Sequence, residues 1–200
     1  MVRVCLAFMF IINMHGRQQL FLPIQVQDRT VLEERRLTVI GQYGLKRKAR
    51  PTVPSHYHTG VDLKRPTKNY SNEPVFSGGV GKVLSVRSDG PFSQIIIQHV
   101  LSPGDTLWTV YEHILGIVCH SGQQVTENTV IARFFNKEEL NKFGWQFDHV
   151  HFEMLKFKPV RLNANPKYPE YHFKTYAIVC YTQTDLHKYT INPMDYFRRK

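Results

Sequence analysis

From residue 39 onward, the sequence consists of short apolar runs that are separated by Gly, Pro, Asn and Asp. Such spacing is typical of short β-strands joined by turns. We therefore predict an all-β fold, an antiparallel β-sheet or sandwich with few short helices. Within residues 80–86, we expect Leu84 and Val86 to face one way and Ser85 to face outward. The expected strands are residues 80–86, 94–98, 107–115, 148–156 and 176–182. Residues 124–135 are expected to form a turn and a strand, and the one expected helix is 137–142.

The composition is that of an ordinary globular protein. The 200 residues include 42% hydrophobic and 21% charged side chains. These values exclude disorder, collagen and coiled coil as fold classes, and the length suggests one domain. No apolar run reaches the roughly 18 to 20 residues of an ordinary transmembrane helix. The formal net charge of +10 favours a polyanionic partner, which includes nucleic acid, anionic lipid and an acidic cell wall.

Within the N-terminal residues 1–17, Arg3 is followed by an apolar run from Val4 to Ile12. This order is typical of a secretory signal peptide, so we predict a signal peptide or N-terminal hydrophobic segment and an exported protein. The alternative is a buried first strand or helix of the domain. Residues 18–38 are expected to connect this segment to one domain that covers residues 39–198.

The three cysteines are Cys5, Cys119 and Cys180, and an odd number predicts no disulfide framework. If Cys5 leaves with a signal peptide, Cys119 and Cys180 could pair. The alternative is two buried thiols that pack as small hydrophobic side chains.

The sharpest local signal is the segment Asp148-His-Val-His-Phe-Glu-Met154. Side chains alternate between the two faces of a strand, so His149, His151 and Glu153 share one face. The other face, which is expected to meet the core, carries Val150, Phe152 and Met154. Two imidazoles on one face suit two metal ligands, or one ligand and one catalytic group. Taken alone, the pattern favours a polar row that faces solvent.

Two further histidines stand in spacings of interest. In an extended chain His58 and Asp62 would lie about 13 Å apart, so sharing a metal requires a bend, which Gly60 permits. His56 offers a competing pair with His58, and a loop histidine near a turn aspartate is the simpler interpretation. His113 lies in the expected strand 107–115, where a histidine is usually a hydrogen-bonded core group.

Taken together, these residues indicate a catalytic metal site. Two histidines and one carboxylate are typical ligands of catalytic zinc, which keeps its fourth position for water. Two other histidines then remain as general base or as donors to the transition state. The spacing does not decide which histidine of His149 and His151 is the ligand.

The order H-x-x-x-D, then Y-x-H, then H-x-H-F-E resembles the lysostaphin-type (LytM-like) zinc metallopeptidases, which cut peptide cross-links of bacterial peptidoglycan. The similarity covers roughly residues 39–197 and extends to the segments 40–44, 74–83, 122–131 and 192–193. The resemblance implies a lysostaphin-type fold, a zinc cofactor and an exported protein in the periplasm, the cell envelope or the extracellular space.

The resemblance also implies a role for each histidine. His58, Asp62 and His151 correspond to the zinc ligands, and His113 and His149 to the catalytic pair. Glu153 either orients a ligand or is a solvated strand residue, and both alternatives stay open.

The sequence departs from the family pattern in two places. Residues 134–148 replace a Gly/Thr-rich loop, and their short helix and aromatic side chains are expected to rim the active site. An insertion at about 157–190 precedes the Asn-Pro ending, and it forms either a binding wall or a surface decoration. The basic runs at 46–50 and 198–200 are expected to attract the anionic groups of peptidoglycan, or to be solvated charges only.

The predicted function is therefore a zinc-dependent metalloendopeptidase that hydrolyses peptide cross-links in bacterial peptidoglycan. The alternative is a catalytically idle protein of the same fold that binds cell wall or regulates another hydrolase. A nucleic-acid binder is a third hypothesis, but the chain lacks C-x-x-C fingers and an obvious recognition helix, so no nucleic-acid partner is expected. Membrane or envelope association through the N-terminal segment is an additional expectation.

Overall fold

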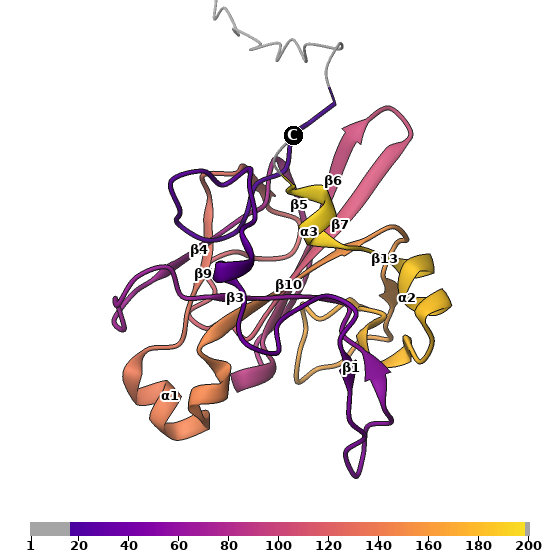
Figure 1. The fold of residues 1–200 in the computed structure, drawn as a ribbon. Helices are drawn as coiled ribbons and strands as arrows, with labels where there is room; N and C mark the ends of the chain where they lie inside the picture. Colours follow the sequence, from indigo (N-terminus) through magenta and orange to yellow (C-terminus); the bar gives the residue numbers. More distant parts are fainter. Residues whose placement is uncertain (1–16, 199–200) are drawn as a thin grey trace, which may run out of the picture.

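The computed structural model describes residues 17–198, and its centre is an antiparallel seven-stranded sheet in the order β13-β10-β7-β6-β5-β8, with β3 also paired to β10 (Figure 1). Strand β3 pairs with the first part of β10 and β13 with its last two residues, so both occupy the same edge. The strands are β3 (Gly60–Lys64), β5 (Gly81–Arg87), β6 (Gln94–Ser102), β7 (Asp105–Glu112), β8 (Gln124–Val125), β10 (His149–Leu155) and β13 (Thr190–Ile191).

Three two-stranded ribbons and a few short helices complete the described part of the chain. The ribbons pair β1 (Lys46–Arg47) with β2 (His56–Tyr57), β4 (Pro74–Phe76) with β9 (Val130–Arg133), and β11 (Val160–Arg161) with β12 (Phe173–Lys174). The helices are α1 (Lys137–Phe143), α2 (Gln183–Tyr189) and α3 (Pro193–Tyr196), with 3-10 turns η1 (Glu34–Arg36), η2 (Gly90–Phe92), η3 (Trp145–Phe147) and η4 (Ala177–Val179). This is the predicted all-β class with few short helices.

Hydrophobic side chains cover both faces of the sheet. The larger core takes one face of β10, with Val150, Phe152 and Met154, as the alternation of the sequence predicts. The N-terminal residues 18–38 run over this face and bury leucines and an isoleucine in the same core, at Leu20, Leu22, Ile24, Leu32 and Leu37.

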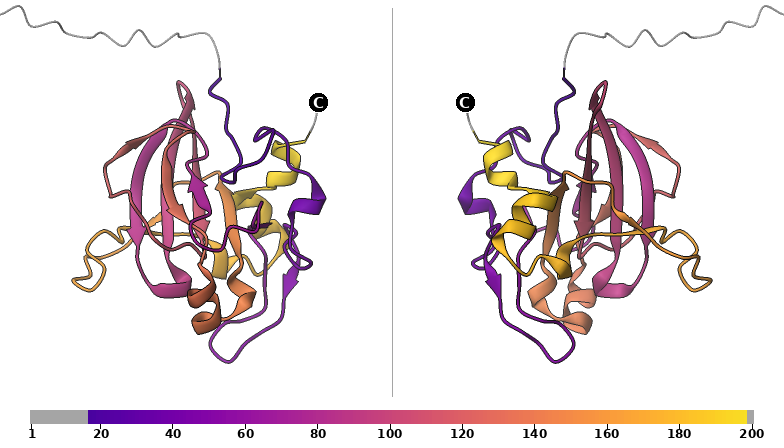
Figure 2. Two further views of the ribbon diagram at one scale, coloured as in Figure 1. Left: turned by 90° about the vertical axis from the view of Figure 1, so that its left-hand side faces the viewer. Right: turned by 90° about the vertical axis from the view of Figure 1, so that its right-hand side faces the viewer.

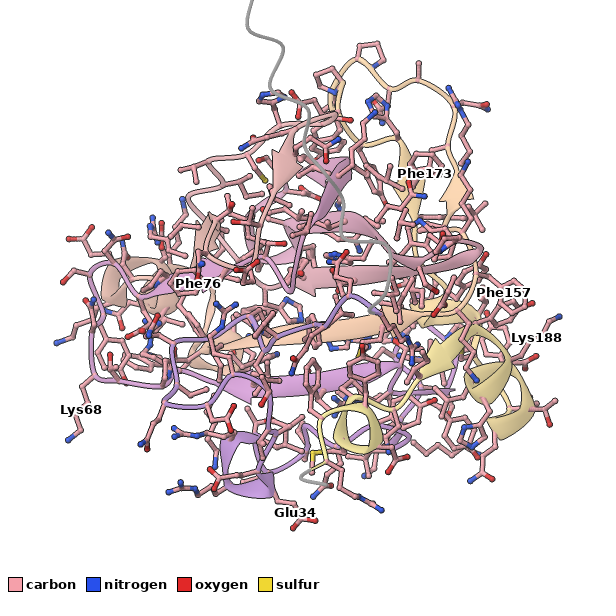
Figure 3. The ribbon with its side chains drawn as sticks, turned by 90° about the horizontal axis from the view of Figure 1, so that it is seen from above. Glu34, Lys68, Phe76, Phe157, Phe173 and Lys188 are labelled. Atoms are coloured by element: carbon pink, nitrogen blue, oxygen red, sulfur yellow. The ribbon has the colours of Figure 1, made fainter. Side chains whose placement is uncertain are left out.

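The smaller core lies on the opposite face, where the inserted segment covers the sheet. Phe173 of β12 packs there against Trp108 and Val110 of β7 and Leu155 of β10. Figure 2 shows the loop between β11 and β12 on one side of the sheet and the N-terminal segment with the C-terminal helices on the other. Figure 3 likewise separates Phe173 from Glu34 across the sheet strands. The insertion therefore contributes a layer of the fold.

The predicted helix is present because its first turn closes a capping box. The Asn136 side chain accepts a hydrogen bond from the Glu139 backbone N–H, and the Glu139 side chain accepts one from the Asn136 backbone N–H. Leu140 is the buried residue of α1. The helix follows β9 and leads through η3 directly into β10.

Three local predictions are wrong. The strand expected over 107–115 ends at Glu112. The strand expected over 176–182 is not formed: Ala177–Val179 make the 3-10 turn η4, in which Ile178 and Val179 are exposed. A β-bulge at Leu84 puts Leu84 against the smaller core while Val86 faces the larger one. Ser85 faces away from the larger core but is buried under the insertion.

The expected signal segment lies outside the described residues, apart from Arg17. Cys119 and Cys180 are buried and free, as the second alternative for them predicts. No helix within residues 17–198 has the length and the hydropathy that crossing a membrane requires.

Candidate metal centre

The sheet brings two distant parts of the chain together at the middle of β10. In the antiparallel pairing of β10 with β3, His151 lies directly opposite Asp62, and in the pairing with β7 it lies opposite Glu112. His58 precedes β3 by two residues. The face of β10 that carries His149, His151 and Glu153 is therefore the face on which Asp62 lies.

Three donor atoms form a nearly equilateral triangle. The Nε2 atom of His58 lies 3.0 Å from Oδ1 of Asp62 and 2.9 Å from Nδ1 of His151, and the third side, from His151 Nδ1 to Asp62 Oδ1, measures 2.9 Å. Two ligands of one zinc ion lie about 3 to 3.5 Å apart, given bonds near 2 Å. The spacing is thus close to that of three protein ligands on one metal ion.

The hydrogen bonds on the far side of each ring show which nitrogens carry lone pairs. Nδ1 of His58 lies 2.8 Å from the carbonyl oxygen of Gln42, which can only accept, so this nitrogen carries the hydrogen. Nε2 of His151 lies 3.0 Å from Oε1 of Glu153 and donates to it in the same way. In the neutral rings, the lone pairs of His58 Nε2 and His151 Nδ1 therefore face Asp62 Oδ1. Three electron-rich atoms at this spacing require a positive centre between them.

The buried carboxylates of the site also require a positive charge beside them. Asp62 and Glu153 are both buried, and Oε2 of Glu153 has no hydrogen-bond partner among the described residues. Burial alone would lower the pKa of His151, but its contacts with Asp62 and Glu153 raise that pKa to about 10. Burial likewise would raise the pKa of Asp62, whereas its contacts with His151 and His58 hold it well below its usual range. Arg47 pairs with Asp62, and the remaining negative charge is compensated either by a proton on His151 or by a metal ion. The donor set of two imidazoles and one carboxylate fits zinc.

Glu153 is therefore a buried partner of His151, and the solvated alternative for it is wrong. Its Oε1 also accepts a hydrogen bond from the Thr59 hydroxyl. A carboxylate that accepts from the second nitrogen of a ligating histidine fixes the ring orientation and the tautomer.

Gly60 has a different role from the expected one. Its φ is not in the left-handed region, and the change of direction falls at the irregular residues 58–59 before β3. A Cβ atom at position 60 would clash with the carbonyl group of Phe152 on β10. Gly60 is thus required for the close approach of β3 to β10, which holds Asp62 opposite His151.

His113 reaches the site through a left-handed turn. Had β7 continued, His113 would lie on the face of Thr109 and Tyr111, which is opposite to that of His151. Instead β7 ends and His113 has φ +58°, the one positive φ of a non-glycine residue in residues 17–198. Its ring centroid then lies 4.9 Å from that of His149 and 6.3 Å from that of His151.

His113 and His149 each have a free ring nitrogen at the site. Nδ1 of His113 donates to the carbonyl oxygen of Pro91 at 2.7 Å, which leaves its Nε2 with a lone pair. Nε2 of His149 lies 3.6 Å from Oδ1 of Asp62. Burial lowers the pKa of His113 and lowers that of His149 to about 3, so both rings are neutral at pH 7.

Two aromatic side chains border His113: Phe147 of η3, as expected for residues 134–148, and Phe92 of η2. Phe147 lies with its ring centroid 5.0 Å from that of His113, and Phe92 lies 6.3 Å from His113 and 6.0 Å from Phe147. Phe92 is half exposed. Phe147 and Phe92 thus form an apolar border beside His113.

The competing histidine His56 does not join the site. It is buried and its Nδ1 contacts the carbonyl oxygen of Pro54 at 2.8 Å, and the group of possible metal ligands in the described residues contains only His58, Asp62 and His151. Arg47, in contrast, does reach the site: its Nη2 donates to Oδ2 of Asp62 at 2.9 Å. The sequence shows Arg47 only as one member of a basic run.

Residues 56–166 match the sequence profile of peptidase family M23. This match covers more than half of the 200 residues, and the chain belongs to this family of LytM-like peptidases, as the resemblance predicted. No curated protein is significantly similar in sequence over the chain.

Several solved structures are similar to the chain. A zinc-containing peptidase from Vibrio cholerae is 25% identical, with 68% of this chain and 37% of that one covered and a TM-score of 0.45. The catalytic domain of lysostaphin from Staphylococcus simulans is 14% identical, with 78% and 88% covered and a TM-score of 0.43. A mutant catalytic domain of the prophage-encoded M23 protein EnpA from Enterococcus faecalis is 23% identical, with 64% and 87% covered and a TM-score of 0.42. The chain thus spans little more than a third of the Vibrio cholerae peptidase.

Proposed function

We propose that the protein is a zinc-dependent metalloendopeptidase that hydrolyses peptide cross-links in bacterial peptidoglycan. The observation that carries the proposal is the triangle of lone-pair atoms of His58, Asp62 and His151, with the rings of His113 and His149 beside it. Membership of peptidase family M23 supports the reaction class. A net charge of +10 suits a substrate with carboxylate and phosphate groups, because it raises the rate of encounter.

In this proposal, His58, Asp62 and His151 hold the zinc ion, and Glu153 keeps His151 in the ligating tautomer. When bound, zinc lowers the pKa of water to about 7 and polarises the scissile carbonyl. The chain's own part is to hold three donor atoms at fixed spacing and to exclude bulk water through the burial of all three side chains.

His113 and His149 carry the protons. Because both rings are neutral at pH 7, each can accept the proton that the attacking water loses. The contact with Pro91 fixes Nδ1 of His113 as a donor, so Nε2 is the atom that exchanges a proton with reacting groups. The ring that has accepted this proton can then donate to the negative charge that develops on the tetrahedral intermediate and pass the proton to the leaving amine. We further propose that residues 1–17 direct the protein out of the cytoplasm to this substrate.

The test is digestion of purified peptidoglycan sacculi by the zinc-loaded protein, followed by mass spectrometry of the released muropeptides. We expect new amine termini at the cross-links, their loss after treatment with a chelator, and their return when zinc is added. Zinc binding without new amine termini would support the alternative of an idle protein that binds cell wall or regulates another hydrolase. DNA binding with a steep salt dependence, unaffected by the chelator, would support a nucleic-acid binder.

A further inference from the structure

The two oxygens of Asp62 have separate environments. Oδ1 is the corner of the triangle with His58 and His151, whereas Oδ2 accepts a hydrogen bond from Nη2 of Arg47 at 2.9 Å. The side chains of Asp62 and Arg47 are 7% and 22% exposed, so the ion pair is largely shielded from water. A charge-assisted hydrogen bond of this kind is stronger than one between neutral groups.

We propose that Arg47 is a positioning residue, which holds Asp62 as a metal ligand through one oxygen only. This inference depends on the proposed zinc site. A carboxylate can bind a metal with one or with both oxygens. With Oδ2 engaged by Arg47, only Oδ1 is directed at the metal position. One-oxygen binding keeps three protein ligands and leaves the fourth position of a tetrahedral ion for water, as catalysis requires.

The hairpin that carries Arg47 is anchored at several points. Within it, Arg47 pairs with His56 and Lys46 with Tyr57. At its base, the backbone N–H of His58 donates to the carbonyl oxygen of Leu45 at 3.0 Å. An isolated two-stranded ribbon is only marginally stable in water, so these connections matter for the position of Arg47.

One of the anchors comes from the insertion. The backbone N–H of Tyr57 donates to the carbonyl oxygen of Cys180 at 2.9 Å, next to the turn η4. The inserted segment is therefore linked to the metal position through Tyr57, Arg47 and Asp62. Through these contacts the insertion helps to position the site, and it also contributes to the smaller core.

The same hairpin supplies matched controls. Lys48 and Arg50 are exposed, carry the same charge as Arg47 and form no ion pair within the described residues. Their removal changes the charge of the hairpin by the same amount as removal of Arg47 but leaves Asp62 untouched. Comparing these variants with an Arg47 variant thus separates the effect of long-range attraction of zinc or substrate from the effect of the direct contact between Arg47 and Asp62.

The experiment measures zinc affinity by competition with a chelating dye for the wild type, R47Q, R47K, K48Q and R50Q. We expect R47Q to bind zinc about 10- to 100-fold more weakly, since outer partners of metal ligands contribute to this extent. R47K should lie between R47Q and the wild type, because its ammonium group can still donate to Oδ2. K48Q and R50Q should equal the wild type. Thermal unfolding of the metal-free variants verifies that each is folded.

A kinetic readout separates positioning from substrate binding. At saturating zinc, R47Q should keep a KM close to that of the wild type but show a lower kcat, because Asp62 is then free to bind the ion with both oxygens and occupy the position of the water. Equal zinc affinity in R47Q and the wild type would overturn the inference, and a raised KM in that case would assign Arg47 to the substrate. A wild type that binds no zinc would instead overturn the proposed function itself.

Discussion

The Nε2 atom of His58 and the Nδ1 atom of His151 lie 2.9 Å apart, although 93 residues separate them in the chain. The outer nitrogen of each ring donates to an oxygen acceptor, Gln42 for one and Glu153 for the other. Two inner lone pairs at this distance repel each other unless a proton or a metal ion lies between them. The ring orientations are set by residues outside the triangle, so the site is preorganised to bind a cation.

The first prediction separates a ligand from a proton carrier. H151A should lose zinc and activity together, because the triangle loses a corner. H113A should keep its zinc and lose rate, by about 10²- to 10⁴-fold, as is typical for the loss of a general acid or base. Bound zinc is measured by elemental analysis and rate by muropeptide release. Equal loss of zinc in both variants would refute this division of roles.

The second prediction concerns Gly60. In G60A, the new methyl group meets the carbonyl of Phe152 and forces β3 away from β10, which should cost about 1 to 3 kcal/mol of unfolding free energy. Zinc affinity should also fall, because Asp62 no longer lies opposite His151. G104A is the control: its φ of +81° brings some strain, but no heavy atom lies within 4 Å of the added methyl group. If G104A weakens zinc binding as much as G60A does, the proposed role of Gly60 is wrong.

The third prediction tests whether the insertion is part of the fold. Phe173 is 8% exposed against the sheet, so F173A should cost about 3 kcal/mol. Phe157 belongs to the same inserted segment but is 49% exposed, and F157A should cost less than about 1 kcal/mol. Urea unfolding of both variants gives the comparison. Similar small losses would mean that the insertion decorates the surface.

The fourth prediction is a loss of stability in acid that originates at His99, far from the metal centre. Its Nδ1 donates to the carbonyl oxygen of Val80 at 2.8 Å, and its Nε2 accepts from the hydroxyl of Thr109 at 2.8 Å. The Thr109 hydroxyl in turn accepts from Tyr111. This one-way chain of hydrogen bonds requires a neutral ring, and burial lowers the pKa of His99 to about 4.

Acid lowers the free energy of unfolding because the unfolded chain binds more protons at His99 than the folded chain does. Between an ordinary pKa near 6.5 and the pKa of about 4, the unfolded chain binds a proton at His99 that the folded chain does not. The free energy of unfolding therefore falls as the pH falls through this range, by up to about 3 kcal/mol from this group. H99Q, whose amide can donate to Val80 and accept from Thr109, should flatten the pH dependence measured by urea unfolding. The exposed His120 gives the control H120Q, which should follow the wild type; an unchanged slope in H99Q would contradict the prediction.

Several features of the fold and site could be predicted from local sequence. The alternation in residues 148–154 identified the face with His149, His151 and Glu153 and the face in the core, because a two-residue period is a property of every strand. The capping residues Asn136 and Glu139 are local in the same sense, and α1 forms where it was expected. The family motif identified the same histidines that the sheet brings together.

Other features could not be predicted because they depend on contacts between distant residues. The end of β7 at Glu112 depends on its pairing with β10, which the local sequence does not show. After this end, the left-handed turn brings His113 to the sheet face of His151. The apolar run 176–182 has the composition of a strand, but it contains the turn η4, and the described part of β2 meets it through the backbone hydrogen bond from Tyr57 to Cys180. The bulge at Leu84 shifts the alternation in β5 relative to its partner β6.

By itself, the sequence determined the strand class, the identity of the candidate ligands and the face of β10 on which they lie, since these follow from side-chain chemistry and local periodicity. Only the tertiary structure decided which atoms meet. The tautomer of His58, the burial of Glu153 and the ion pair of Arg47 with Asp62 all depend on how the β1–β2 hairpin, β3 and β10 pack together, which includes the close approach that Gly60 allows. Such contacts join residues far apart in the chain, and no local pattern encodes their distances.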